Sequence, residues 1–218
     1  MKRVSLLKVF LLLFLLSFSA VDAMAIGLGF NLSAGGGTTE WDVEDQYFYT
    51  EWEDDSDDSR GAIGFIFDTA VAKKSIFNYR LNVGSESVSY DFDLAGKYEA
   101  SGWFMAHDFG FAILRKKNLR LWAGPEIRLS YVKGEHETFS DRKIEVFSIG
   151  IGPVVGLNVN FKKGLTLALK AGILSMGSGG EIDYKSLPLD PDLEIGGSGG
   201  YSFINIGLIF RIGDEYKK

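Results

Sequence analysis

Charged side chains recur inside segments that otherwise alternate apolar and small residues. Four carboxylates and five cations share the face of the small residues: Asp68, Glu86, Asp108 and Glu126 against Arg80, Arg120, Arg128, Lys170 and Arg211. Two carboxylates held close together compete for ionisation unless a cation intervenes, which is the chemistry of a gate or a proton site. A nearly balanced set can equally form a structural charge network. We favour the structural network and keep the gate as the alternative.

A second set of carboxylates lies in residues 38–59, which contain ten acids and no Lys or Arg. Asp54, Asp55, Asp57 and Asp58 could supply oxygen ligands to Ca²⁺ or Mg²⁺. Their spacing lacks the downstream Glu of an EF-hand loop, so a solvated, self-repelling loop is favoured over a metal site. We expect no other cofactor.

Aromatic residues are interleaved with these acids: Trp41, Tyr47, Phe48, Tyr49 and Trp52. Aromatic side chains supply much of the energy of protein interfaces, so this segment could contact a surface protein partner. The alternative is a mobile loop whose rings rest on the rest of the protein. Nucleic acid is not an expected partner, because the excess charge is acidic and confined to one segment.

Catalysis by a histidine needs that residue beside a nucleophile or an acid. The chain has two histidines, His107 and His136, and neither stands in a His-x-Ser arrangement. There is no cysteine, which excludes thiol chemistry and disulfides. The sequence therefore predicts no catalytic site.

Strands must position these side chains, because apolar residues recur with a period of two in eight segments. The first segment has Ile26, Leu28, Phe30 and Leu32 on one face and small residues such as Gly27, Gly29 and Asn31 on the other. A soluble sandwich would carry Lys, Glu and Thr on that second face. Small residues instead suit a narrow lumen. We therefore predict an all-β, eight-stranded antiparallel up-and-down transmembrane β-barrel.

Three Lys-Lys pairs punctuate the segments: Lys73-Lys74, Lys116-Lys117 and Lys162-Lys163. We expect tight periplasmic turns there and longer extracellular loops at the other end, including the acidic segment and a long loop from Gly177 to Gly200. Both chain termini would then be periplasmic.

The same turns predict the register of two hairpins. Residues whose numbers sum to 148 lie opposite each other across the first turn, which places Asp68 beside Arg80. Across the second turn the sum is about 234, so Asp108 faces Glu126. Arg128 and Lys170 are then the cations available to that pair of carboxylates.

Some residues do not fit the predicted alternation of outward and inward side chains. Pro125 and Pro153 fall on the outward face and cannot donate to a strand ladder, so bulges are expected at Gly124-Pro125 and Gly152-Pro153. The pattern also changes face near Gly84, which indicates either a bulge or the point where the strand leaves the membrane.

Residues 1–25 resemble a cleavable secretory signal. Lys2, Arg3 and Lys8 precede an apolar run, and small residues follow it. The run is shorter than the ~20 residues of a spanning helix. We therefore expect a signal peptide over 1–25, the barrel over 26–213 and a short periplasmic tail over 214–218.

The last segment carries a polar residue, a glycine two residues later, and then an aromatic and an apolar residue at alternate positions: Asn205, Gly207, Phe210 and Ile212. This pattern resembles the insertion signal of outer-membrane barrels, although the chain continues beyond it to Lys218. The mature chain as a whole resembles the small OmpA, OmpX, OmpW-like and opacity-type, porin-like barrels.

The resemblance implies a bacterial outer-membrane location and recognition by the barrel-insertion machinery. It also implies contact with outer-membrane lipid and lipopolysaccharide. Members of this group serve as structural anchors, adhesins or conduits, so fold alone does not decide function. We expect a structural or adhesin-like surface role with the lumen filled by charges. The alternative is a conduit for small hydrophobic or amphipathic molecules.

Overall fold

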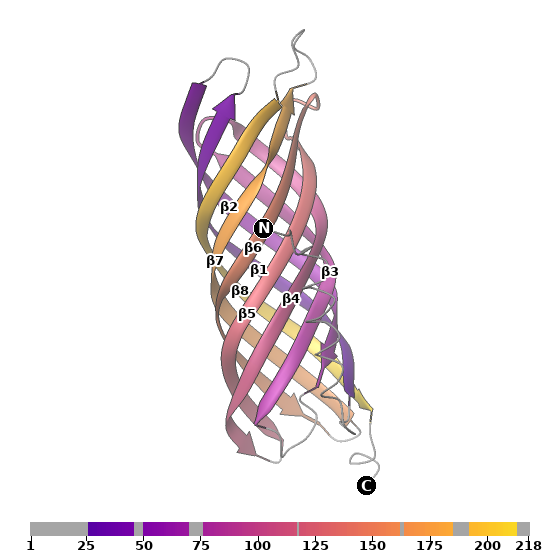
Figure 1. Ribbon diagram of the computed structural model, residues 1–218. Helices are drawn as coiled ribbons and strands as arrows, with labels where there is room; N and C mark the ends of the chain where they lie inside the picture. Colours follow the sequence, from indigo (N-terminus) through magenta and orange to yellow (C-terminus); the bar gives the residue numbers. More distant parts are fainter. Residues whose placement is uncertain are drawn as a thin grey trace, which may run out of the picture.

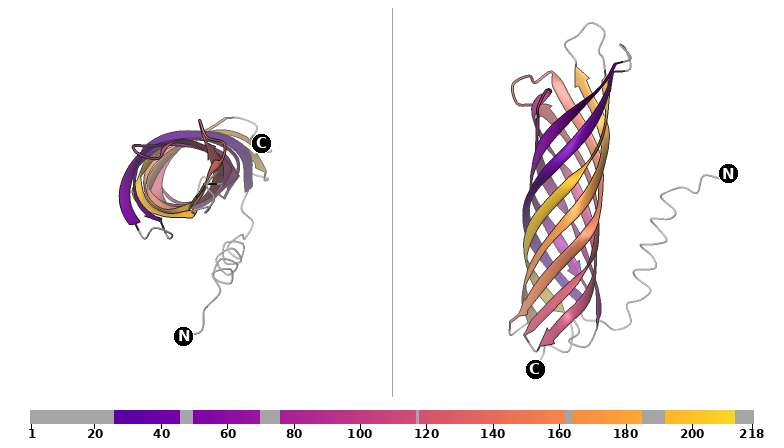
Figure 2. Two further views of the ribbon diagram at one scale, coloured as in Figure 1. Left: turned by 90° about the horizontal axis from the view of Figure 1, so that it is seen from above. Right: turned by 90° about the vertical axis from the view of Figure 1, so that its left-hand side faces the viewer.

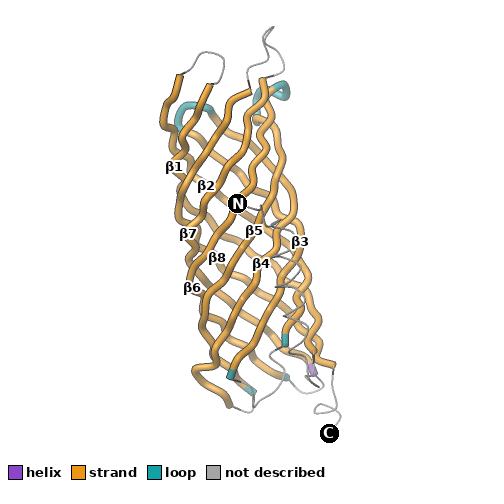
Figure 3. The backbone as a smooth tube through the Cα atoms, in the orientation of Figure 1, coloured by secondary structure: helices purple, strands orange, loops and turns teal. Residues whose placement is uncertain are grey.

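Eight antiparallel strands close into one barrel in the computed structural model of this chain (Figures 1 and 3). The structure describes residues 26–45, 50–69, 76–116, 118–161, 164–184 and 192–212. In chain order the strands are β1 (Ile26–Asp45), β2 (Thr50–Asp68), β3 (Phe77–Phe92), β4 (Gly96–Lys116), β5 (Leu119–His136), β6 (Arg142–Asn160), β7 (Leu165–Tyr184) and β8 (Asp192–Ile212). Each strand pairs with the next, and β8 pairs with β1, which confirms the predicted up-and-down barrel. Among the described residues, no helix has the length and apolar character needed to span a membrane.

The two ends of the barrel differ in which connections they carry. One end, here called the turn end, holds the paired residues Ile26 and Ile212 and lies below in Figure 1. Its connections are residues 69–76, 117–118 and 161–164. The opposite end, here called the loop end, has connections at residues 46–49, 93–95, 137–141 and 185–191. Two predicted segments, the signal peptide and the periplasmic tail, lie outside the described residues. The lysines of the three Lys-Lys pairs also lie outside them, except Lys116.

The predicted contrast between tight turns and long loops is wrong. Residues 69–76 at the turn end form a longer connection than residues 93–95 at the loop end. The strands themselves are extended instead. β1 and β2 include the acidic segment except for residues 46–49, and β7 and β8 include the segment 177–200 except for residues 185–191.

An apolar belt surrounds the part of the barrel nearest the turn end, and its outward parity is as predicted. Its most exposed members are Leu28, Phe30, Leu32, Ile63, Phe65, Phe111, Ile113, Ile149, Ile151, Val155, Ile173, Ile204, Ile206, Phe210 and Ile212. Membrane strands need ~9 to 11 residues, whereas these strands have 16 to 21. Each strand therefore continues well beyond the belt. The side view in Figure 2 shows that the strands run, tilted, along the whole length of the barrel.

Beyond the belt, toward the loop end, the apolar face reverses on every strand except β2, whose buried residues there are polar or charged: Asp54, Ser56, Asp58 and Arg60. On β3, Phe77 and Val83 point outward, whereas Val88, Tyr90 and Phe92 are buried inside. The inward set forms a cluster, here called the apolar plug: Trp41, Val43, Val88, Tyr90, Phe92, Tyr98, Ala100, Val132, Ile144, Val146, Ile182, Leu193 and Ile195. The register between β2 and β3 is continuous through Gly84, so the change there is the edge of the belt and not a bulge.

The two bulges predicted at prolines are also absent. Pro125 lies directly opposite Pro153, and the pairing of β5 with β6 continues through both without a shift. The missing N–H groups instead interrupt the pairing of β5 with β4 and of β6 with β7 for two residues at this level, without a change of register. In the described sheet, the register shift that does occur lies between β4 and β5 at Ala112 and Leu114.

Arginine at two outward positions of β1 tests where the belt ends. Phe30 lies in the middle of the outward apolar run of this strand, and Thr38 lies beyond it on the same face. Phe30→Arg should destabilise the folded barrel by about 2–4 kcal/mol, because it places a charge in hydrocarbon. Thr38→Arg should cost less than about 1 kcal/mol. Urea unfolding in lipid vesicles measures both, and equal costs would contradict the assigned edge.

Candidate functional site

The predicted charged residues all lie inside the barrel, where they form three layers along its axis. In the layer nearest the turn end, Arg80 and Asp68 are directly opposite each other, as the sum of 148 predicts, and their side chains are 2.7 Å apart. Arg80 also donates to Asn158 Oδ1 at 3.0 Å and lies over the ring of Trp122. Asn158 belongs to β6, so this contact spans the lumen from β3.

Two further arginines complete this lower layer. Arg211 donates to Thr166 Oγ1 at 2.7 Å and lies 4.0 Å from Asp68. Arg120 donates to Asn78 Oδ1 at 3.2 Å. All these polar side chains are buried, and their mutual contacts replace part of the solvation that water would give.

The middle layer brings together the second predicted pair. Asp108 and Glu126 face each other across β4 and β5, in agreement with the sum of 234. The cation between them is Lys170 of β7, whose Nζ is 2.9 Å from Asp108 and 2.6 Å from Glu126. Asn82 donates to Asp108 Oδ2 at 3.2 Å. One lysine therefore bridges two buried carboxylates.

The upper layer lies between these ions and the apolar plug. Arg128 pairs with Glu86 at 2.5 Å, and its guanidinium lies over the rings of Phe104 and Tyr201. Arg128 was expected near Asp108 and Glu126, but the structure places its partner one layer higher, on β3. The guanidinium of Arg60 also lies over the Tyr201 ring, 5.4 Å from its centroid.

Sequence reasoning missed Arg60 and the interior rings. Arg60 has the same parity on β2 as Asp68, so its inward direction could have been read from the alternation. It was overlooked because residues up to 59 were interpreted as a loop. The rings of Trp122, Phe104, Tyr201 and Phe203 also have inward parity, and four of the lumen cations lie on an aromatic face.

The four aspartates proposed as metal ligands do not converge. Asp54 and Asp58 point inward and Asp55 and Asp57 point outward, because they alternate along β2. Asp54 accepts hydrogen bonds from the backbone of Leu94 and Ala95, and Asp58 accepts from Thr39 and Ser56. Within the described ranges, no group of three or more His, Cys, Asp or Glu side chains could hold a metal ion.

Outward acids of the β1–β2 hairpin oppose each other directly. The cross-strand pairs are Glu40 with Asp55, Asp42 with Glu53, and Glu44 with Glu51. These six residues together with Asp57 are here called the acidic face. Like charges in direct opposition destabilise a sheet. The acidic face is therefore maintained at an energetic cost.

The outer surface of β4 to β6 differs, because its acids are paired with lysines. Lys97 contacts Glu99, Lys143 contacts Glu135, and Lys133 contacts Glu145. Hydrogen bonds from Lys133 and from Tyr131 lower the pKa of the Glu145 carboxyl below its usual range. The two sides of the barrel beyond the belt thus differ in net charge.

Each histidine makes a local hydrogen bond. His107 faces outward in the belt, where its Nδ1 is 2.6 Å from the hydroxyl of Tyr79. His136 Nδ1 accepts hydrogen bonds from the backbone of Thr138 and Phe139.

The residues of the predicted insertion signal lie on β8 with the expected alternation. Asn205 and Gly207 face the lumen, and Phe210 and Ile212 face outward in the belt. A Cβ on Gly207 would lie 2.5 Å from Ile66 Cδ1, so a larger residue there requires the Ile66 side chain to shift. Recognition of the strand by an insertion machinery stays a prediction.

Removing the bridging lysine tests the middle layer. Lys170→Met keeps the length of the side chain but leaves Asp108 and Glu126 buried without a cation, so it should destabilise the barrel by about 3–5 kcal/mol. The matched control, Lys170→Met with Asp108→Asn and Glu126→Gln, removes all three charges and should recover most of that loss. Denaturant unfolding measures both, and an equally unstable triple variant would contradict the electrostatic explanation.

Comparison with known proteins supports the fold. No protein-family model and no curated protein matches the chain. Among solved structures, the outer membrane protein OprG from Pseudomonas aeruginosa is similar, with a TM-score of 0.61 and 12% identity over 88% of this chain and 98% of that chain. The outer membrane protease OmpT from Escherichia coli covers 89% of this chain and all of its own, with 11% identity but a TM-score of 0.44. Neisserial surface protein A has 10% identity and a TM-score of 0.33, over 80% of this chain and 95% of its own. The chain therefore has the fold of the outer-membrane β-barrels, in an eight-stranded antiparallel form.

Proposed function

We propose that this protein is a non-conducting, non-enzymatic outer-membrane barrel with a structural and surface-interaction role. The turn end and both chain termini face the periplasm, and the loop end faces the cell exterior. This orientation is supported by the position of the belt, which begins at the strand ends of the turn end. The polar extension lies at the loop end, and in outer-membrane barrels the larger exposed segments are extracellular.

The observation that carries the proposal is that side chains meet across the lumen at successive levels. Arg80 reaches Asn158 on β6, Lys170 reaches Asp108 on β4, and Arg128 reaches Glu86 on β3. The apolar plug occupies the lumen beyond them. An interior of eight strands is just wide enough for side chains to fill.

The conduit is the less supported alternative. A path for small hydrophobic molecules needs an apolar lumen or a lateral opening. Here the lumen within the belt holds buried ions, and the plug closes it toward the loop end. Both features favour a sealed barrel.

Planar-bilayer recording tests the sealed lumen. The purified barrel should show at most small and rare conductance steps, because ion passage requires breaking several buried ion pairs. A variant that truncates the plug, Trp41→Ala with Tyr90→Ala, should conduct little more, since the three charged layers remain. Large, steady, porin-like currents from the unchanged protein would overturn the proposal.

The acidic face supports a surface partner of opposite charge. Its carboxylates lie on one side of the loop end, away from the lysine-paired acids of β4 to β6. Uncompensated like charges are costly to the fold, so they are better explained by an interaction than by stability. A basic protein surface is the complementary partner.

Neutralising the acidic face tests this role. The variant Glu40→Gln, Asp42→Asn, Glu53→Gln and Asp55→Asn should gain about 0.2–1 kcal/mol of stability for each relieved pair. It should also lose most binding of a lysine-rich peptide to cells that display the barrel. The control Glu99→Gln with Glu135→Gln removes acids that are paired with lysines and should leave binding unchanged. Equal binding by all three proteins would contradict the proposed surface.

A further inference from the structure

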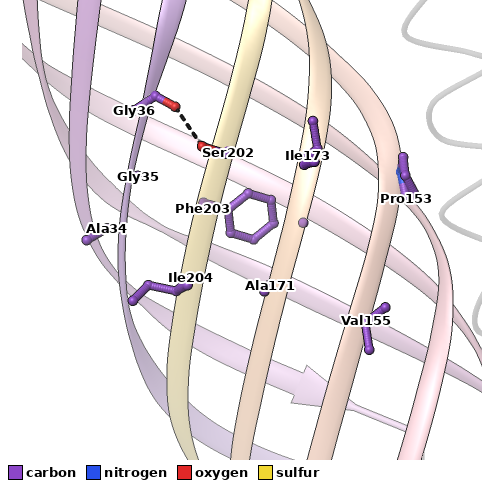
Figure 4. A pocket seen from close by; sticks show the side chains of 11 residues that line it. Ala34, Gly35, Gly36, Pro153, Val155, Ala171, Ile173, Ser202, Phe203 and Ile204 are labelled. Carbon is purple, nitrogen blue, oxygen red and sulfur yellow. Dashed lines mark hydrogen bonds between the residues drawn. The ribbon is translucent and has the colours of Figure 1, made fainter.

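The outer wall of the barrel contains an apolar groove of about 760 Å³ that crosses β6, β7, β8 and β1 (Figure 4). Small residues, Ala34, Gly36 and Ala171, form its shallow parts. Its flanks are the larger side chains of the belt: Val155, Ile173 and Ile204. The groove is therefore open to the hydrocarbon that surrounds the belt.

The wall beneath the groove is thin at one inward-facing ring. Phe203 points into the barrel but also lines the groove, since its two cross-strand neighbours are Gly35 and Gly172. A Cβ on Gly35 would lie 2.8 Å from Phe203 Cβ, and one on Gly172 would lie 2.9 Å from its ring. Ser202 donates a hydrogen bond to the carbonyl of Gly36 at the groove margin. The hollow is thus a packed feature of the wall.

The belt determines what can occupy the groove. Ile173 and Ile204 are 65% and 60% exposed and belong to the surface that contacts lipid. The groove is continuous with that surface and its lining is almost entirely apolar, so its occupant is a hydrocarbon chain. A branched or bulky group is less suitable, because the hollow follows the wall between strands.

The surface above the groove determines where a headgroup would lie. Gly36 lies just beyond Leu32, the last large outward apolar residue of β1, and therefore at the loop-end edge of the belt. Glu40 is four residues farther along β1, which is about 13 Å at ~3.3 Å per residue, or about 9 Å along the membrane normal for a strand tilted by ~45°. The headgroup region extends roughly 5 to 8 Å beyond the hydrocarbon on each side of the bilayer. Between the two levels lie small residues, Thr38, Ser198 and Gly200, and a Cβ on Gly200 would meet nothing within 4 Å. A chain in the groove can therefore run up the wall to the level of the acidic face.

The charged residues at the upper end of the path determine which lipid headgroup can bind there. In the described parts of β7, β8, β1 and β2, every Lys and Arg points inward: Lys170, Arg211 and Arg60 are buried. The outward residues near the upper end of the path include Glu40 and Asp57. A phosphate there finds no cation on these strands, whereas a primary ammonium group finds two carboxylates.

We propose that the groove binds one acyl chain of an aminophospholipid, whose ammonium group lies against Glu40 and Asp57. This site depends on the belt and the acidic face. It does not depend on which end of the barrel faces the cell exterior, so it goes beyond the proposed function and can fail independently of it.

Lipid retention tests the site. The purified barrel is reconstituted with equal amounts of phosphatidylethanolamine and phosphatidylglycerol of identical chains, and the lipids retained after detergent extraction are counted by native mass spectrometry. Phosphatidylethanolamine should be retained about fivefold more, the factor that corresponds to about 1 kcal/mol for one charge near a membrane surface. A parallel sample with lipopolysaccharide tests the glycolipid as a competing occupant.

Four variants separate the chain from the headgroup. Ala171→Leu fills the groove and should abolish retention of both lipids, whereas Ala123→Leu adds the same bulk to the belt on β5, outside the groove, and should not. Glu40→Gln with Asp57→Asn should keep the retained lipid but remove the preference. The control Glu99→Gln, on β4 beside Lys97, should leave the preference intact.

Three results would overturn the proposal: equal retention of the two phospholipids by the unchanged protein, unchanged retention by Ala171→Leu, or stronger retention of lipopolysaccharide than of phosphatidylethanolamine. Heat-modifiable migration on gels shows that each variant is folded. If a variant does not fold, the comparison of lipids on the unchanged protein decides by itself.

Discussion

Closure of the backbone ladder between β1 and β8 is the constraint on which the rest of the structure depends. The two strands pair without interruption from Ile26 opposite Ile212 to Asp45 opposite Leu193. In hydrocarbon an unpaired strand edge would leave several backbone groups without partners, each at a cost of several kcal/mol. Closure also gives every strand an inside and an outside, and that distinction decides the environment of each side chain.

What surrounds the barrel then explains the reversal of its apolar face. Within the belt the outside is lipid, so apolar side chains face outward and polar ones must be satisfied within the lumen. Beyond the belt the outside is water, so Trp41, Tyr90 and Val132 turn inward and form a core like that of a soluble barrel. The same closed sheet therefore has charged layers inside where lipid surrounds it and the apolar plug inside where water surrounds it.

Charges on the outer surface are distributed unevenly around the barrel, whereas the charges in the lumen are paired. Buried ions such as Lys170 and Asp108 have partners, because an uncompensated charge in the interior is strongly destabilising. On the surface the cost of like charges is smaller, and the acidic face retains three opposed pairs. The wall below it is thinned at Gly35 and Gly172. The acidic face and the thin part of the wall therefore lie on the same side of the barrel, which β7, β8, β1 and β2 form.

Local alternation was sufficient to predict the strands, their outward faces and the contacts across two hairpins. Asp68 opposite Arg80 and Asp108 opposite Glu126 follow from counting along neighbouring strands, since a hairpin makes register a local property. The strand ends were wrong beyond the belt, because apolar residues there point inward and the acidic residues resemble a loop. Tertiary structure alone decided that Lys170 bridges Asp108 and Glu126, that Arg128 pairs with Glu86, and that Phe203 closes the floor of the groove. These partners lie on strands that do not follow one another in the chain or meet only through the curvature of the closed wall, so no local pattern contains them.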